Sequence, residues 1–149
     1  MPKELVLFST LAGTFIMHFT TVFSSLILAA SALAVNLTTS GKYDVSGNTL
    51  YVSACPSLRS KYPTYGDIPN FPYVAGSSIV TEEDSPMCGT CWQLTTAEGS
   101  SITVSVIDKQ DDGYVTGNAP YYYLTGKHQY ELPFVDVGVV QLDASECGF

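Results

Sequence analysis

The sequence contains little positive charge. Six lysine and arginine residues stand against fourteen aspartate and glutamate residues, which gives a formal net charge of −8 at pH 7. Such a chain repels phosphate backbones and anionic lipid surfaces, so we expect neither nucleic acid nor an anionic membrane as a partner. Neutral sugars are compatible with this charge.

Most enzyme motifs are also missing. His128 is the one histidine after residue 34, and no Gly-x-Ser-x-Gly elbow accompanies it, so a Ser-His-Asp hydrolase is not expected and His128 is interpreted as a loop residue. No glycine-rich phosphate loop is present. A glycoside hydrolase stays open, because that chemistry needs only two acidic side chains and residues 35–149 hold all the acidic residues except Glu4.

Residues 5–34 carry no charge and end in the small residues typical of a signal-peptidase site. We therefore predict a signal peptide over 1–34, cleavage after Ala34 and a single domain over 35–149. A membrane-spanning helix is the alternative for an apolar run of this length, but only one lysine precedes it. Translation from Met17 would give a leader of ordinary length, so the true start codon is a second open question.

All four cysteines follow the predicted leader. An even number of cysteines in a small exported chain indicates two disulfides formed in an oxidising compartment, each stabilising the fold by about 2–4 kcal/mol. Asn36 begins an Asn-Leu-Thr glycosylation sequon. Together these features predict a protein that is secreted to the extracellular space or the cell wall.

No window keeps the 3.6-residue apolar periodicity of a helix for three turns, so an all-β barrel or sandwich is predicted. Alternation of apolar and polar residues predicts strands over 49–55, 91–95, 101–107 and 134–142. The second and third of these should form a hairpin. Within the last, Gly138 should mark a bulge or a close backbone approach.

Two segments between the predicted strands have a different character. Residues 62–76 are rich in proline, glycine and tyrosine, which predicts a long ordered loop. A short helix is predicted over 120–125, with Asn118 as its N-cap and Gly126 as its C-terminal stop.

The Cys88-Gly89-Thr90-Cys91 motif allows three interpretations. A redox pair would sit at the start of a helix, whereas this motif leads into a predicted strand. A zinc site would need a second close pair of ligands, and the remaining cysteines and His128 are dispersed. We therefore expect a structural role in which each of the two cysteines pairs with a distant one, and we expect no metal and no cofactor.

Two segments resemble the central signature of the cerato-platanin family in order and spacing: 62–73, which reads YPTYGDIPNFPY, and 84–92, which reads DSPMCGTCW. The segments 106–108, 113–114 and 139–147 continue the resemblance over nearly all of the predicted mature chain. It implies a six-stranded double-ψ β-barrel with one or two short helices, similar to the first domain of expansins. It also implies the disulfides Cys55–Cys88 and Cys91–Cys147.

The resemblance implies a function as well. Its members are secreted, bind chitin-type oligosaccharides in a shallow groove, can loosen cellulose in the manner of expansins, and are often sensed by plants as elicitors; they are not known as hydrolases. Carried over residue by residue, the carbohydrate-binding residues are Asp108, Tyr114, Asp84 and Tyr62. Asp108 would accept hydrogen bonds from the sugar and Tyr114 would stack on it, whereas the role of turn cap is favoured for Asp84.

The sequence departs from the family pattern near this site. Glu82-Glu83 replace the usual Gly-Trp, and Val115 replaces an asparagine. We expect a monomeric, non-catalytic protein whose partners are chitin or N-acetylglucosamine oligosaccharides, other wall polysaccharides and a plant receptor. Two alternatives remain: a surface-active or receptor-recognised elicitor that binds no sugar, and a weak glycoside hydrolase.

Overall fold

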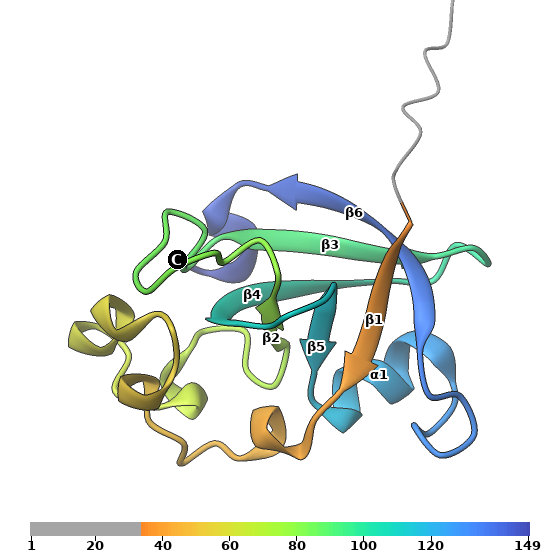
Figure 1. Cartoon of the computed structure of the whole chain (residues 1–149), viewed down its shortest axis with the longest axis horizontal. Coiled ribbons are helices and arrows are strands. Elements are labelled where there is room, and N and C mark those ends of the chain that lie inside the picture. Colours follow the sequence, from red (N-terminus) through yellow and green to blue (C-terminus); the bar gives the residue numbers. More distant parts are fainter. Residues whose placement is uncertain (1–33) are drawn as a thin grey trace, which may run out of the picture. The chain divides into compact units, whose positions relative to one another are not determined.

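The computed structural model describes residues 34–149, which form six strands and one α-helix (Figure 1). The predicted signal peptide lies outside these residues except for Ala34. No helix in the described part of the chain is long and apolar enough to cross a bilayer. The elements are β1 (Val35–Thr39), β2 (Val74–Ser77), β3 (Cys91–Thr96), β4 (Ser101–Lys109), β5 (Tyr114–Thr116), α1 (Asn118–Thr125) and β6 (Val135–Leu142).

The six strands close into a barrel in the order β1, β5, β2, β4, β3, β6. Two of the pairs, β1 with β5 and β2 with β4, are parallel, and the other four are antiparallel. The barrel closes because β1 pairs with β5 on one side and with β6 on the other. This topology confirms the predicted six-stranded double-ψ barrel.

The strands with clear alternation are confirmed. β3, β4 and β6 lie where the pattern placed them, and β3 and β4 form the predicted antiparallel hairpin. Leu94, Ile102 and Val104 from this hairpin are buried in the core. Removing their apolar surface from water is the main force that holds the hairpin in the barrel.

The predicted strand over 49–55 is wrong. Leu50–Val52 is a 3₁₀ turn whose N-cap, Thr49, accepts a hydrogen bond from the Tyr51 amide. Leu50 is fully buried, but Tyr51 is 66% exposed and Val52 is 65% exposed. A single inward side chain followed by two outward ones fits a turn on the surface of the barrel rather than a strand.

Three strands were not predicted. β1, β2 and β5 hold only five, four and three residues, and all residues of β2 and β5 are buried, so no alternation marks them. β2 lies at the end of the segment predicted as a long loop, 62–76. The remainder of that segment is irregular apart from a 3₁₀ turn at Tyr65–Asp67, as expected.

Two finer predictions also need correction. The β3–β6 register continues through Gly138 without a shift, so the bulge predicted there is absent. The bulge lies between Ala75 and Gly76 in the β2–β4 pair instead. Helix α1 begins at Asn118 with Gly117 as its N-cap, whereas Gly126 ends the helix in the left-handed conformation as predicted.

Both disulfides implied by the family resemblance are present. Cys55–Cys88 joins chain segments 33 residues apart, and Cys91–Cys147 joins segments 56 residues apart. The first ties the irregular region after the turn at Leu50–Val52 to the loop before β3, and the second ties β3 to the C-terminal 3₁₀ turn Ala144–Cys147. Two disulfides fit a protein of an oxidising, extracellular environment.

Candidate functional site

Asp108, near the end of β4, lies at the centre of a polar network and is only 5% exposed. Its Oδ1 accepts hydrogen bonds from the amides of Ala54, at 2.8 Å, and Lys109, at 2.9 Å. Its Oδ2 accepts one from the Lys42 ammonium and one from the Tyr43 hydroxyl, the latter at 3.2 Å. A carboxylate offers about four acceptor positions, so all of them are occupied.

The β2–β4 bulge makes room for this network. It sets Gly76 opposite Asp108 in the register. A Cβ atom on Gly76 would lie 2.2 Å from the Tyr43 hydroxyl and 2.7 Å from Cγ of Gln110, so any larger residue there would displace these two side chains. Gln110 donates from Nε2 to the Tyr43 hydroxyl at 2.7 Å, which adds a fourth side chain to Asp108, Lys42 and Tyr43.

Two buried tyrosines lie beside the carboxylate. The rings of Tyr43 and Tyr65 are stacked, with centroids 6.0 Å apart and planes 12° apart. Burial, and then the negative charge of Asp108, raise the pKa of both phenols well above its usual range. Tyr43 is therefore a neutral hydrogen-bond donor to Asp108 at any physiological pH.

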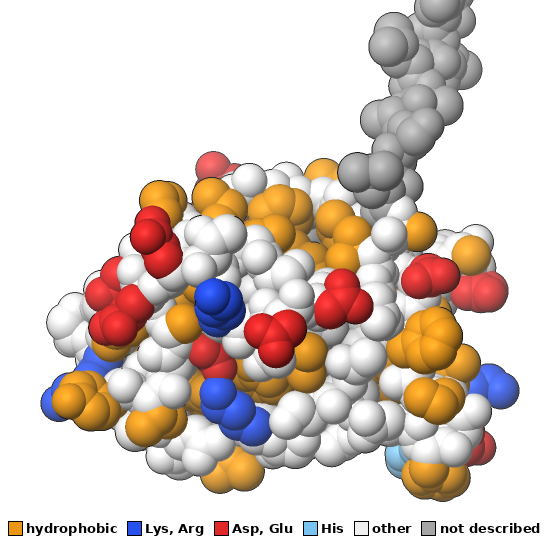
Figure 2. All heavy atoms as spheres, viewed as in Figure 1, with side chains coloured by type: hydrophobic (Ala, Val, Ile, Leu, Met, Phe, Trp, Pro, Cys, Tyr) orange, Lys and Arg blue, Asp and Glu red, His pale blue; other side chains and the backbone are white. Residues whose placement is uncertain are grey.

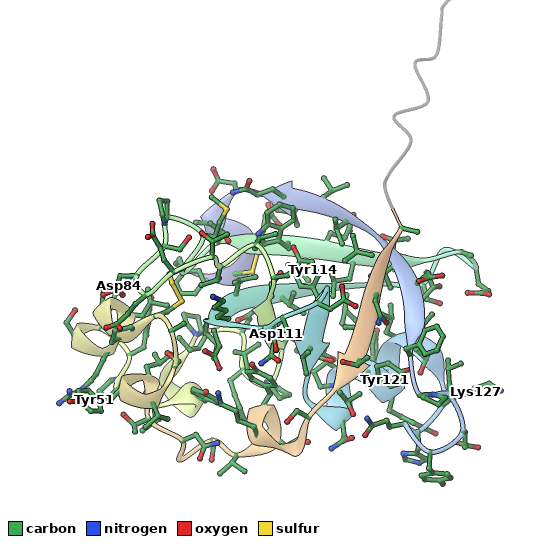
Figure 3. The ribbon with its side chains drawn as sticks, viewed as in Figure 1. Tyr51, Asp84, Asp111, Tyr114, Tyr121 and Lys127 are labelled. Carbon is green, nitrogen blue, oxygen red and sulfur yellow. A yellow bond between two sulfur atoms is a disulfide. The ribbon has the colours of Figure 1, made fainter. Side chains whose placement is uncertain are left out.

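Part of the network faces solvent. The Lys42 side chain is 37% exposed, and its ammonium has three donors, of which Asp108 takes one. Gln110 is half-buried, and its second amide hydrogen and carbonyl are not used within the network. Figure 2 shows acidic and basic side chains close together on this face, and Figure 3 places Asp111 in front of the barrel there. The surface formed by Lys42, Gln110 and Asp111 over Asp108 is called the Asp108 surface below.

Asp84 lies at a turn beside the same region (Figure 3). It has a positive φ of 52°, its amide donates to the Ala54 carbonyl at 2.8 Å, and its Oδ1 accepts from the Ser57 amide at 2.8 Å. Asp84 thus bonds to both ends of the 54–57 segment, and Asp108 accepts from the amide at its first residue, Ala54. This geometry fits the turn-capping interpretation of Asp84.

The two tyrosines of the predicted site lie in the interior. Tyr114, in β5, is 1% exposed and its ring lies 6.2 Å from that of Trp92; burial raises its pKa to about 12. Tyr62 is 7% exposed and packs edge-on against Phe149. The expectation that Tyr114 offers a free face for stacking on a sugar is therefore not met, because its ring is enclosed by the core.

Asn36, the predicted glycosylation site, lies in β1 and donates from Nδ2 to Oδ2 of Asp112 at 3.3 Å. Its backbone oxygen lies against Gly113, where a Cβ atom would approach it to 1.9 Å and where φ is 52°. This contact explains the glycine that precedes β5. Glycosylation of Asn36 stays a prediction.

Lys42, Tyr43 and Gln110 were not predicted as site residues. Lys42 and Tyr43 lie in the 3₁₀ turn Gly41–Asp44, more than sixty positions from Asp108 in sequence. Asp44 holds this turn in place by accepting hydrogen bonds from the amide and side chain of Asn118 at the start of α1.

Residues 35–149 match the family model described as Cerato-platanin. The chain is 36% identical over 129 residues to Cerato-platanin of Ceratocystis fimbriata f. sp. platani, a match that covers 84% of this chain and 95% of that protein. It is also 28% identical over 123 residues to Allergen Asp f 15 of Aspergillus fumigatus, covering 80% of each.

Solved structures show the same architecture. The crystal structure of cerato-platanin 2 from M. perniciosa matches with a TM-score of 0.73 and 30% identity, over 78% of this chain and 99% of that one. The solution structure described as that of the fungal elicitor Cerato-Platanin matches with a TM-score of 0.69 and 33% identity, over 76% of this chain and 96% of that one. The two disulfides, the barrel and these matches together show that the chain belongs to the cerato-platanin family.

Proposed function

We propose that this protein is a secreted, non-catalytic binder of neutral wall polysaccharide, with N-acetylglucosamine oligomers of the chitin type as its first ligand. The Asp108 surface is its contact region, and expansin-like loosening of the wall follows from competition for sugar hydroxyls. The observation that carries this proposal is a buried, fully hydrogen-bonded Asp108 that orients polar groups of Lys42 and Gln110 toward solvent.

The network assigns a particular role to each group. The acceptor positions of Asp108 are filled, so it acts as a positioning residue unless a ligand displaces Lys42. The free donors of Lys42 and the free carbonyl of Gln110 then meet sugar hydroxyls and acetamide groups. Each such bond replaces one to water and contributes only about 1 kcal/mol, so binding is weak and reversible.

The same geometry supports a non-catalytic function. A glycoside hydrolase needs a carboxyl group that holds a proton for the leaving oxygen. Both oxygens of Asp108 are already engaged by four donors from this protein, so Asp108 is poorly placed to contact a leaving oxygen. Incubation with chitin and with cellulose tests this directly, because release of reducing sugar would favour the hydrolase alternative.

Binding is tested by titrating chitotetraose into the wild-type protein and into Lys42→Met. Loss of a charged donor weakens a sugar contact by about 1–2 kcal/mol, so the variant should bind roughly fivefold to thirtyfold more weakly. Lys61→Met is the matched control, because the Lys61 ammonium lies 5.0 Å from the centroid of the Tyr62 ring, outside the network. Equal affinity of wild type and Lys42→Met would exclude the Asp108 surface as the contact region.

The description of one similar structure as that of a fungal elicitor favours a second candidate, recognition by a plant receptor. Eight large apolar side chains on the described surface are at least half exposed, among them Tyr51 and Tyr130, and these suit protein or interfacial contacts. A plant defence response to Lys42→Met equal to that of the wild type would separate elicitor activity from sugar binding at the Asp108 surface.

A further inference from the structure

A pocket of about 380 Å³ lies on another part of the barrel, between the β3–β4 turn, the C-terminal end of α1 and the start of β6. Ser100, which lines it, precedes β4, whereas Asp108 lies near the other end of that strand. At about 3.3 Å per residue, the β4 backbone separates the two sites by more than about 20 Å. The pocket is therefore distinct from the Asp108 surface.

The lining of this pocket is amphipathic. Leu124, Leu132 and Val135 contribute apolar side chains, and Glu98 and Lys127 contribute opposite charges. The Lys42–Asp108 pair is the one salt bridge within residues 34–149, so Glu98 and Lys127 are not ion-paired with each other or with another described residue. Opposite charges on one pocket suit a ligand with no net charge.

Beside the pocket, α1 and the loop that follows it hold a column of three aromatic rings, with Tyr122 in the helix and His128 and Tyr130 in the loop. The ring centroid of His128 lies 4.7 Å from that of Tyr122 and 5.4 Å from that of Tyr130, with the planes within 26° and 13° of parallel. Tyr130 is 84% exposed and Tyr122 is 50% exposed. Figure 2 shows this cluster as hydrophobic side chains around a histidine at the lower right, below α1 and the following loop in Figure 1.

The loop that carries His128 and Tyr130 is fixed by hydrogen bonds. The Glu131 carboxylate accepts from the His128 amide at 2.9 Å, and the amides of Glu131 and Leu132 donate back to the His128 carbonyl. The Tyr121 hydroxyl donates to the Leu132 carbonyl at 2.7 Å, which ties the loop to α1. The exposed rings are therefore held in place before any ligand arrives, which lowers the entropic cost of binding.

We propose that this pocket and the adjoining ring column form a second carbohydrate site that binds neutral pyranose rings. One ring enters the pocket, with its apolar C–H face on Leu132 and Val135 and its hydroxyls toward Glu98 and Lys127. A neighbouring ring stacks on the outer face of Tyr130. The volume is within the range of small-molecule pockets and suits one sugar ring.

A second site would make the protein bivalent. Its two sites lie on different parts of one rigid barrel, so a single molecule can contact two neighbouring polysaccharide chains. Binding at both sites raises the apparent affinity for insoluble polysaccharide well above that for a short soluble oligomer. The inference extends the proposed function but does not depend on the Asp108 surface being active.

Backbone amide shifts of the isotope-labelled, disulfide-bonded protein, followed during titration with chitotetraose and separately with cellotetraose, test the proposal. At least one of the two sugars should shift the amides of Thr96, Ser100 and Lys127. Glu98→Gln and Tyr130→Ala should each weaken these shifts at least threefold in apparent affinity. Tyr51→Ala, at another exposed aromatic position that does not line the pocket, should bind as the wild type does.

The pattern of shifts separates the two claims. Shifts confined to residues around Asp108 would overturn the second site and leave the proposed function standing. Shifts confined to the pocket would support the second site and overturn the Asp108 surface. With no shift from either sugar at any residue, both claims would be wrong.

Discussion

At the scale of single residues, Asp108 has a structural role that any mutational test of binding must take into account. Asp108→Ala removes four hydrogen bonds and leaves the Ala54 amide and the Tyr43 hydroxyl without their acceptor. We expect the free energy of unfolding to fall by about 2–4 kcal/mol, since each buried donor left unpaired costs about 1–3 kcal/mol. Denaturant titration with the disulfides intact measures this; a loss below about 1 kcal/mol would contradict the network.

Gly76 is the second residue on which the site depends. Gly76→Ala places a methyl group 2.2 Å from the Tyr43 hydroxyl, which must move and release Asp108. We expect a loss of stability of at least about 2 kcal/mol, because overpacking and a broken polar network add together. Gly47→Ala is the matched control: no atom lies within 4 Å of the methyl group that it would add, so its thermal midpoint should stay close to that of the wild type.

Individual site residues were only partly predictable. Asp108 was identified from the family motif at the end of a strand, but the saturation of its carboxylate was not, because its partners come from positions 42, 43 and 54, far away in sequence. Tyr114 shows the reverse limitation. A tyrosine has the chemistry of both a sugar platform and a core residue, and only the closure of β5 between β1 and β2 decides that this ring is buried.

At the scale of elements, the region from the 3₁₀ turn at Leu50–Val52 to β2 forms one bridge, between Thr49 and Thr64, but no extended strand pairing. It is anchored instead by Cys55–Cys88 and by the contacts of Ala54 and Ser57 with Asp108 and Asp84. Its stability should therefore depend on the disulfide more than that of the barrel does.

Replacing Cys55 and Cys88 together by serine tests this difference. A closed loop of 33 residues contributes about 3–4 kcal/mol through the entropy of the unfolded chain. Hydrogen exchange of amides in 50–68 should accelerate much more than exchange in β3 and β4, because strand pairing protects the latter. Uniform acceleration along the whole chain would show that this region does not open separately.

The same elements show which part of secondary structure the sequence encodes locally. β3, β4 and β6 were predictable because apolar and polar residues alternate in strands of six or more residues, even though 104–108 of β4 are buried on both faces. β2 and β5 were not, since a three- or four-residue strand buried on both faces has no period, and its partners are set by the closed barrel. The false strand at 49–55 arose from an alternation that a capped turn also satisfies.

At the scale of the whole molecule, buried tyrosines make stability depend on pH at the alkaline end. Burial raises the pKa of Tyr114 from 10.0 to about 12, and the pKa values of Tyr43 and Tyr65 are also raised. Between the pKa of a tyrosine in the unfolded chain and its raised pKa in the folded chain, the unfolded chain binds fewer protons than the folded one. The free energy of unfolding therefore falls as pH rises through this range. The contribution of Tyr114 is complete below about pH 10 and is lost as pH rises toward 12.

Ultraviolet absorbance of tyrosinate, recorded with circular dichroism during an alkaline titration, measures this effect. The buried Tyr43, Tyr65 and Tyr114 should ionise only together with cooperative unfolding. Tyr130→Phe, at an 84% exposed position, should leave the alkaline midpoint unchanged. Early ionisation of every tyrosine in the native state would contradict the burial of Tyr43, Tyr65 and Tyr114.

The closed strand order has a consequence for self-association. Because β1 pairs on both sides, each strand of the barrel in residues 34–149 has two neighbours, and residues 138–142 of β6, which pair with β3 alone, leave only a short stretch of backbone unpaired. We therefore expect films or clusters of native molecules to grow mainly through side chains, with little new intermolecular β-sheet. The infrared amide band of such material should match that of dilute protein, and dilution should redisperse it.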